Sequence, residues 1–359
     1  MLPIASILTQ LLSIFASLVG ISFIIVFHEF GHYIFCKIFN VYTPTFSIGI
    51  GKVLCSKKIG DTNFCISAGP IGGYVEVASE SGINGSVGFN QIPYYQKVLI
   101  MLGGIFFNFL LTYFIFIGLF FTGMPDSAAG PYEPSTVQIA KIEPNSINQL
   151  NLQNGDTLIS LNNQPLKQNL TNARKIIAQS VMAGATSISA EILRNGSHHH
   201  ATLALKGAST PPSFSKQLEI FMMQKPGLPL IQSVSMAYKA VHFYLHAIAS
   251  GLKEMISARS AHGFVGPVMA VAASSKSAQK GASSLLFLLA IISINLGFMN
   301  LLPLPIFDGG QFVIFTTETL MRRELSERIR HMIGVSSWVL AIGLLVVFTI
   351  RDLYTLIWH

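Results

Sequence analysis

The sequence is poor in charged side chains. Asp, Glu, Lys and Arg make up 11% of its 359 residues, while 51% of the residues are hydrophobic. A typical soluble protein carries about 25% charged residues, so this composition excludes an ordinary soluble protein. The composition predicts a membrane protein.

Long basic clusters are also missing. The formal net charge is +7, but the Lys and Arg residues are scattered, and no long basic stretch interleaves with aromatic residues as in nucleic-acid-binding segments. We therefore expect no nucleic-acid partner and interpret the positive charge as a signal of membrane topology.

Cysteine is scarce. The three cysteines, Cys36, Cys55 and Cys65, lie in one early region. Their spacings fit neither a zinc ribbon nor an obvious disulfide framework. We expect reduced thiols that face the cytoplasm.

The sequence does contain four long apolar runs. They cover about residues 11–35, 98–121, 281–307 and 332–350. Their lengths suit helices that cross a bilayer, which takes roughly 20 residues. The first run lacks the basic start of a signal peptide and is too long for one, so we expect it to remain as a transmembrane helix. The predicted fold class is a polytopic α-helical membrane protein with four transmembrane helices.

The first run ends in the motif His28-Glu29-Phe30-Gly31-His32. Four residues separate the two histidines, which places both imidazoles on one helix face, within reach of one zinc ion. Glu29 lies beside them and could take a proton from a water that the metal activates. A chance match is the alternative, but ionisable residues at the end of an uncharged run are costly unless they are paired or bind a metal. The spacing predicts metal-assisted hydrolysis.

The third run has a broken end. It contains Asn295 and Asn300, and Pro303 and Pro305 precede Asp308. Two prolines one residue apart cannot continue a regular helix, so the freed backbone groups must lie against protein or a wet cavity. Asp308 is then a candidate for the third protein ligand of the zinc ion, with a cap of the following helix as the alternative.

Residues 36–97 are mixed in composition, which predicts short strands and turns. Residues 62–67 and 74–77 are predicted to form a β-hairpin whose turn is supplied by the intervening glycines and Pro70. An ordinary surface hairpin is an equally open interpretation of this stretch.

The second run contains Gly103, Gly104 and Asn108. Small residues allow close helix packing in a membrane, and we interpret Asn108 as a hydrogen-bond partner of a neighbouring helix rather than as a catalytic group.

Residues 122–206 are polar and rich in turns, which predicts a small α/β domain. The histidine triplet at 198–200 is interpreted as a solvated turn rather than a metal site, because consecutive side chains point in different directions. Apolar residues then recur at helical spacing from Val234 to Met255, which predicts an amphipathic helix. The sequence leaves open whether this helix lies on the membrane surface or packs on the soluble domain.

The loop charges predict an orientation. Five lysines follow the first run and four arginines precede the last, so both connections are expected to be cytoplasmic. The soluble domain and both termini then lie outside. The ends that carry His32 and Asp308 lie on the same side, as a shared metal requires.

The chain resembles the site-2 protease family, and most of all its bacterial regulator-of-sigma-E type. The resemblance is carried by the first motif, by Gly72-Gly73-Tyr74-Val75 and by the stretch Asn300-Leu301-Leu302-Pro303-Leu304-Pro305-Ile306-Phe307-Asp308-Gly309-Gly310. The stretch from Ile142 to Leu166 also resembles a PDZ domain of the bacterial protease type. Two features depart from the family pattern: a single PDZ-like domain where close relatives often have two, and Phe307 where Leu is usual.

The resemblance implies roles for these residues. His28, His32 and Asp308 would be the Zn²⁺ ligands, Glu29 the general base and Asn300 a substrate-positioning residue. The edge formed by Gly72, Gly73, Tyr74 and Val75 would engage the substrate as a strand.

These expectations combine into one architecture. Residues 1–121 and 281–359 form two catalytic halves, 122–206 a PDZ-like domain and 207–280 an extracytoplasmic linker. The implied function is zinc-dependent cleavage of single-pass membrane proteins, such as an anti-sigma factor or signal-peptide remnants, within the lipid bilayer of the bacterial inner membrane. A catalytically silent adaptor and a zinc transporter are the alternatives. An adaptor would not need Glu29, and a transporter would need more intramembrane ligands.

Overall fold

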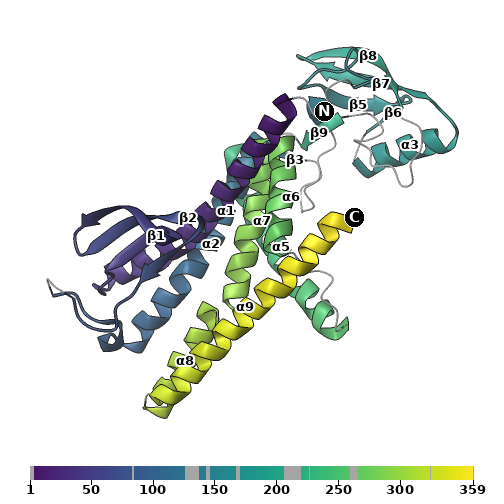
Figure 1. Cartoon of the computed structure of the whole chain (residues 1–359). Helices are drawn as coiled ribbons and strands as arrows, with labels where there is room; N and C mark the ends of the chain where they lie inside the picture. Colours follow the sequence, from purple (N-terminus) through teal and green to yellow (C-terminus); the bar gives the residue numbers. More distant parts are fainter. Residues whose placement is uncertain are drawn as a thin grey trace. The chain divides into compact units, whose positions relative to one another are not determined.

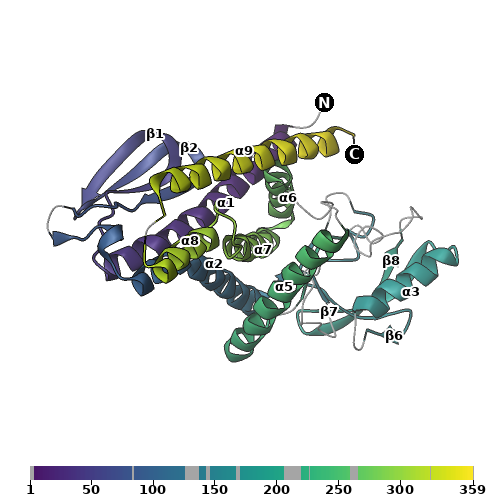
Figure 2. The same cartoon turned by 90° about the horizontal axis from the view of Figure 1, so that it is seen from below.

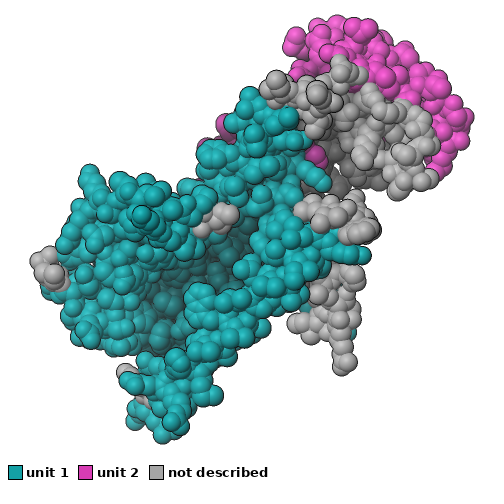
Figure 3. All heavy atoms as spheres, viewed as in Figure 1, with its two compact units in different colours: residues 1–113, 244–279, 288–359 teal, residues 114–243, 280–287 magenta. Residues whose placement is uncertain are grey.

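The computed structural model describes residues 4–82, 85–125, 137–142, 146–166, 170–205, 220–225, 227–258, 266–323 and 325–358. The chain divides into two compact units (Figure 3). Unit 1 consists of residues 1–113, 244–279 and 288–359, and unit 2 consists of residues 114–243 and 280–287.

The four predicted spans are confirmed. Within the described residues, four helices are long and apolar enough to cross a membrane (Figure 1): α1 (Ile4–Ile38), α2 (Tyr94–Thr122), α7 (Ala282–Asn300) and α9 (Glu327–Trp358). Helix α7 ends at Asn300, ahead of Pro303 and Pro305. The third apolar run therefore breaks where the prolines remove backbone donors.

Small residues let α1 and α2 lie close together, as predicted for the second span. A Cβ atom added to Gly103 would lie 2.7 Å from the carbonyl oxygen of Gly31, so no larger residue fits at this crossing. Thr112 of α2 donates a hydrogen bond to the carbonyl oxygen of Ala290 in α7, at 3.3 Å. These contacts join α1, α2 and α7 in unit 1 (Figure 2).

Two 15-residue strands, β1 (Thr45–Ile59) and β2 (Thr62–Glu76), lie between α1 and α2 in the chain. A hairpin is present in this region, but the predicted position of its turn was wrong: β1 and β2 are joined at residues 60–61. Residues 63–66 and 73–76 do not pair with each other, because both pair with 45–48. Gly72 has a φ of +95°, a conformation that side chains disfavour, and the glycine-rich stretch bends one long strand instead of closing a turn.

The β1–β2 sheet packs on α1. The Tyr33 ring centroid lies 5.4 Å from that of Phe46 and 5.5 Å from that of Phe64. The Ser22 hydroxyl donates to the carbonyl oxygen of Pro70 in β2. These contacts hold β2 along the helix that carries the histidine motif.

Three further helices follow: α5 (Leu230–Ala258), α6 (Pro267–Lys280) and α8 (Asp308–Met321). The predicted amphipathic helix is confirmed as α5. Asp352 of α9 is buried, and its carboxylate accepts the backbone N–H groups of Gly266 and Met269 at the start of α6. This contact stabilises the helix start, where backbone donors have no partner within the helix.

Unit 2 contains an antiparallel sheet in the order β3-β9-β4-β5-β7-β8, with β6 paired to β5. The strands are β3 (Met124–Pro125), β4 (Val137–Ile142), β5 (Thr157–Leu161), β6 (Gln164–Pro165), β7 (Ser187–Arg194), β8 (Ser197–Ala204) and β9 (Ile220–Lys225). Helix α3 (Leu170–Met182) supplies Ile177 to the same core as Leu158 and Ile192. A buried apolar core between helix and sheet stabilises this unit.

The predicted turn at the histidine triplet was wrong. The triplet lies in β8, because Asn195 and Gly196, both at positive φ, already close the β7–β8 turn. His198 Nδ1 lies 2.7 Å from Glu191 Oε1. This hydrogen bond, with one from Ser160, holds the pKa of the Glu191 carboxyl below its usual value.

Candidate metal centre

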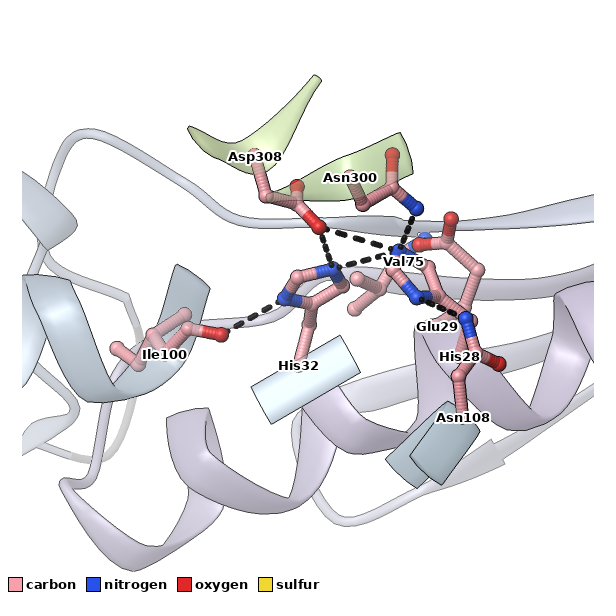
Figure 4. Close-up of polar contacts among 8 residues, drawn as sticks. All are labelled: His28, Glu29, His32, Val75, Ile100, Asn108, Asn300 and Asp308. Atoms are coloured by element: carbon pink, nitrogen blue, oxygen red, sulfur yellow. Dashed lines mark hydrogen bonds and ion pairs between the residues drawn. The ribbon is translucent and has the colours of Figure 1, made fainter. Parts of the chain in front are cut away.

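Three side chains of unit 1 converge on one point (Figure 4). His28 Nε2 lies 3.2 Å from His32 Nε2 and 3.2 Å from Asp308 Oδ2, and His32 Nε2 lies 3.4 Å from the same oxygen. Both histidines are buried, and the Asp308 side chain is 19% exposed. No other group of three His, Cys, Asp or Glu residues in the described part of the chain brings its ligand atoms so close.

The spacing of these atoms fits a zinc ion. Tetrahedral zinc with bonds of about 2.0–2.1 Å separates its ligand atoms by roughly 3.3–3.4 Å. The three measured separations, 3.2, 3.2 and 3.4 Å, match one face of such a tetrahedron. Two imidazoles and one carboxylate leave a fourth position open, as in catalytic zinc sites.

The local sequence explains how Asp308 reaches the histidines. Phe307, not Asp308, occupies the cap position of α8, and it makes no side-chain capping bond. A Cβ atom added to Gly309 would lie 2.6 Å from the carbonyl oxygen of Leu302, so this glycine lets α8 start against the end of the broken segment. The Asp308 carboxylate is then directed at His28 and His32, and the capping alternative does not describe it.

Helix α2 orients both imidazoles. His32 Nδ1 lies 2.7 Å from the carbonyl oxygen of Ile100, which can only accept, so Nδ1 carries the proton and Nε2 is free. His28 Nδ1 lies 3.0 Å from Nδ2 of Asn108. Gly104 lies between Ile100 and Asn108 on α2. A Cβ atom on Gly104 would lie 2.6 Å from His28 Cε1, so only glycine leaves room for the two imidazole rings.

Glu29 makes no hydrogen bond to the three converging atoms. It is hydrogen-bonded to strand β2 instead. The backbone N–H of Val75 donates to its carboxylate at 3.1 Å (Figure 4). Residues 73–76 pair with 45–48 along one side, and the described residues supply no strand for the other side. The open edge of β2 therefore faces the carboxylate beside the metal ligands.

Of the remaining predicted residues, Asn300 contacts His28, and Gly72, Gly73 and Tyr74 precede Val75 on β2. Asn300 is buried at the end of α7, and its Nδ2 atom is 3.4 Å from His28 Nε2. A Cβ atom on Gly73 would lie 3.1 Å from a methyl group of Val26, which places this part of the edge against α1. Tyr74 is 40% exposed, and Gly72 forms the bend that precedes it.

Sequence reasoning missed two contacts: the carbonyl of Ile100 and the N–H of Val75 as a partner of Glu29. These backbone groups carry no residue-specific signal. Asn108 was expected to bond a neighbouring helix, and the structure identifies its partner as His28.

Comparisons with known proteins agree with this geometry. The model of peptidase family M50 matches residues 16–344. A protein of Campylobacter jejuni that bears the name "putative zinc metalloprotease" is 28% identical over 363 residues, covering 95% of this chain and 93% of that protein. Proteins with the same description from Clostridium perfringens and Helicobacter pylori strain J99 are 26% and 29% identical, and each alignment covers more than nine-tenths of both chains.

The family match spans nearly the whole chain, includes the second and third candidate spans in full and most of the first and fourth, and contains all three converging ligand residues. The zinc metalloprotease descriptions of the relatives suit the ligand set of two histidines and one aspartate. The chain belongs to peptidase family M50 and is a zinc-dependent intramembrane protease of the site-2 protease type.

Proposed function

We propose that His28, His32 and Asp308 hold the zinc ion and that Glu29 is the general base for peptide-bond hydrolysis. The observation that carries this assignment is the convergence of the three ligand atoms within 3.4 Å of one another, with Glu29 adjacent to His28 in the sequence. When bound, zinc supplies a Lewis acid that polarises a carbonyl group and makes water more acidic. Glu29 then accepts a proton from water and delivers it to the leaving amine.

The substrate is held as an extended strand. A transmembrane helix uses its carbonyl groups in its own hydrogen bonds, so it must unwind before a protease can reach them. Unwound backbone in a bilayer needs new partners. The open edge at residues 73–76 offers them by strand addition, and Asn300, next to His28, binds the other side of the substrate.

The same edge links substrate binding to the base. Val75 N–H donates to the Glu29 carboxylate. A substrate carbonyl that accepts this N–H takes the place of the carboxylate, which releases Glu29 to face water. Binding of the substrate strand to β2 and release of the Glu29 carboxylate then occur together.

The substrate reaches the site through a hollow in unit 1. Figure 3 shows a deep hollow in unit 1 between the side that carries β1 and β2 and the side that carries α9. Only 6% of the apolar window of α9 is buried. A substrate helix in the bilayer can approach this hollow along the lipid-facing side of α9.

The substrate class is single-pass membrane proteins, such as an anti-sigma factor or signal-peptide remnants, in the bacterial inner membrane. The proposal divides the chain into catalytic halves at 1–121 and 281–359, a single PDZ-like domain at 122–206 and an extracytoplasmic linker at 207–280. The linker contributes to the sheet, because β9 pairs with β4. The PDZ-like domain and both termini face outside.

The test uses the full chain in lipid nanodiscs with a single-pass model substrate. The parent should contain one zinc ion per chain and cleave within the transmembrane segment. Glu29→Gln should retain zinc and lower turnover by about 10²–10⁴-fold, because the amide preserves shape but cannot accept the proton. Undiminished cleavage by Glu29→Gln would refute the assigned base, and a parent without zinc would refute the ligand set.

A further inference from the structure

The side chain of Asn108 lies directly against His28. Its Nδ2 atom is 3.0 Å from Nδ1, the imidazole nitrogen that is not among the converging ligand atoms (Figure 4). Asn108 is fully buried, and its Oδ1 atom has no hydrogen-bond partner in the part of the chain that the structure describes. A buried amide oxygen without a partner is unfavourable, so this side chain needs an explanation.

The chemistry of imidazole supplies the explanation. His28 can bind a metal through Nε2 only if Nε2 carries no proton, and in the neutral ring the proton is then on Nδ1. An Nδ1–H group is a donor and needs an acceptor. An amide NH₂ group cannot accept, but the two ends of the amide have nearly the same shape, so a half-turn places Oδ1 against Nδ1 without other movement.

His32 shows the arrangement that a metal ligand requires. Its Nδ1 atom faces the carbonyl oxygen of Ile100 at 2.7 Å, and a main-chain carbonyl cannot exchange a donor for an acceptor. Ile100 and Asn108 are roughly two turns apart on α2, and they face two histidines one turn apart on α1. Helix α2 therefore offers one oxygen to each imidazole once the Asn108 amide has turned.

The backbone of Asn108 is held in place for this contact. The hydroxyl groups of Thr112 and Ser293 both donate to its carbonyl oxygen, at 2.9 and 3.0 Å. The side chain therefore starts from a fixed point between α2 and α7. Its one hydrogen-bond partner in the described residues is His28.

We infer that Asn108 is the positioning residue of His28: with metal bound, its carbonyl oxygen accepts the Nδ1 proton and leaves Nε2 free for the zinc ion. The inference rests on the proposed role of His28 as a ligand. It gives a functional reason for the hydrogen bond between helices that the sequence suggested. The partner of Asn108 is the metal ligand itself.

The experiment measures the zinc dissociation constant of the purified full chain by competition with a chelator. Asn108→Leu removes the acceptor at similar volume and should weaken zinc binding about 10–100-fold, the usual cost of losing a partner of a metal-bound histidine. Asn108→Asp keeps an acceptor and has no donor, so it should bind zinc at least as tightly as the parent.

Ser17→Ala is the matched control, since it removes a buried hydroxyl of α1 that donates within its own helix, to the carbonyl oxygen of Ser13, and contacts neither Asn108 nor His28, and it should leave zinc affinity within twofold. His28→Ala supplies the reference for loss of a ligand. If His28→Ala binds zinc like the parent, the proposed ligand set has failed. If His28→Ala loses zinc but the Asn108 variants do not show the expected zinc affinities, the positioning role has failed.

Two results would overturn the inference: a folded Asn108→Leu that binds zinc as tightly as the parent, or an Asn108→Asp that loses zinc. The second result would show that the NH₂ group, not the carbonyl oxygen, is what His28 needs. If Asn108→Leu does not fold, Asn108→Asp alone decides. The absorption spectrum of cobalt-loaded Asn108→Asp should also keep the parent's tetrahedral bands.

Discussion

Two sets of histidines in this protein are arranged differently: one set converges on a point and the other does not. His28 and His32 lie four residues apart on α1, and their Nε2 atoms meet at 3.2 Å with Asp308 Oδ2 beside them. The triplet at 198–200 lies on β8, where successive side chains alternate between faces, and His198 instead pairs with Glu191 at 2.7 Å. Residue type is the same in both regions. The periodicity of the element decides whether imidazoles converge.

The two regions also differ in what pairs their carboxylates. The Asp308 side chain is 19% exposed and faces two imidazoles, and its buried Oδ2 atom makes no hydrogen bond within the described structure. Asp156 in unit 2 is only 1% exposed, and Arg194 donates to both of its oxygens at 2.7 and 2.6 Å. A fully paired carboxylate stabilises a fold, whereas one that is left for a metal forms a site.

The largest expected effect separates the two histidine sets directly. His28→Ala, His32→Ala or Asp308→Asn should reduce zinc from one ion per chain to near zero and abolish cleavage, because each removes a proposed ligand. His198→Ala and His200→Ala should change neither. Metal analysis of dialysed protein checks both. Loss of zinc in the His198 or His200 variants would contradict the distinction drawn between the two sets of histidines.

The proposed topology places the two regions on opposite sides of the membrane. A thiol reagent that cannot cross membranes should label a cysteine introduced at Ser197, in β8, from outside in intact cells. Cys55, the exposed native thiol, should react only after the membrane is opened, while Cys36 and Cys65 are buried. Labelling in the opposite sense would reverse the proposed orientation.

A smaller effect is expected at the strand edge. Val75→Pro removes the N–H that contacts Glu29 and should slow cleavage of an intact transmembrane substrate more than that of a short, extended peptide, with zinc retained. Val75→Ala keeps the N–H and should behave like the parent. Equal loss with both substrates would show damage to the base rather than loss of strand addition.

The smallest effect on catalysis is expected from Arg194→Ala. It removes the charged partner of the buried Asp156 carboxylate, which keeps the hydrogen bond from the backbone N–H of Gln153, and should destabilise unit 2 by about 1.5–3 kcal/mol, the contribution of hydrogen bonds to a charged group. Zinc content should not change. Thermal unfolding followed by strand circular dichroism checks the stability, and Ser197→Ala, at an exposed position next to the same turn, tests whether any substitution there has the same effect.

The β1–β2 region shows where sequence reasoning failed. Residues 62–77 contain glycines and a proline that are typical of a turn, yet the chain continues as one bent strand. Local turn signals were outweighed by a long-range partner, since residues 73–76 pair with 45–48 rather than with their neighbours. This kind of pairing is set by tertiary packing on α1, through rings such as Tyr33 and Phe46.

Sequence alone was sufficient for the features that depend on local chemistry. The four spans follow from apolar length, the break after Asn300 follows from the prolines, and one imidazole face follows from helical periodicity. Each of these arises within about 25 residues, so no distant contact can alter it. The metal-ligand roles remain predictions, although the fold brings all three atoms together.

Only the tertiary structure decided which distant groups surround those residues. The carbonyl of Ile100, the amide of Asn108 and the N–H of Val75 reach His32, His28 and Glu29 from other elements. Their positions depend on how closely α2 and β2 pack on α1, which Gly31 and Gly103 permit for α2 and Gly73 permits for β2. A backbone donor or acceptor is the same in every residue, so its partner is determined by packing and cannot be determined by sequence.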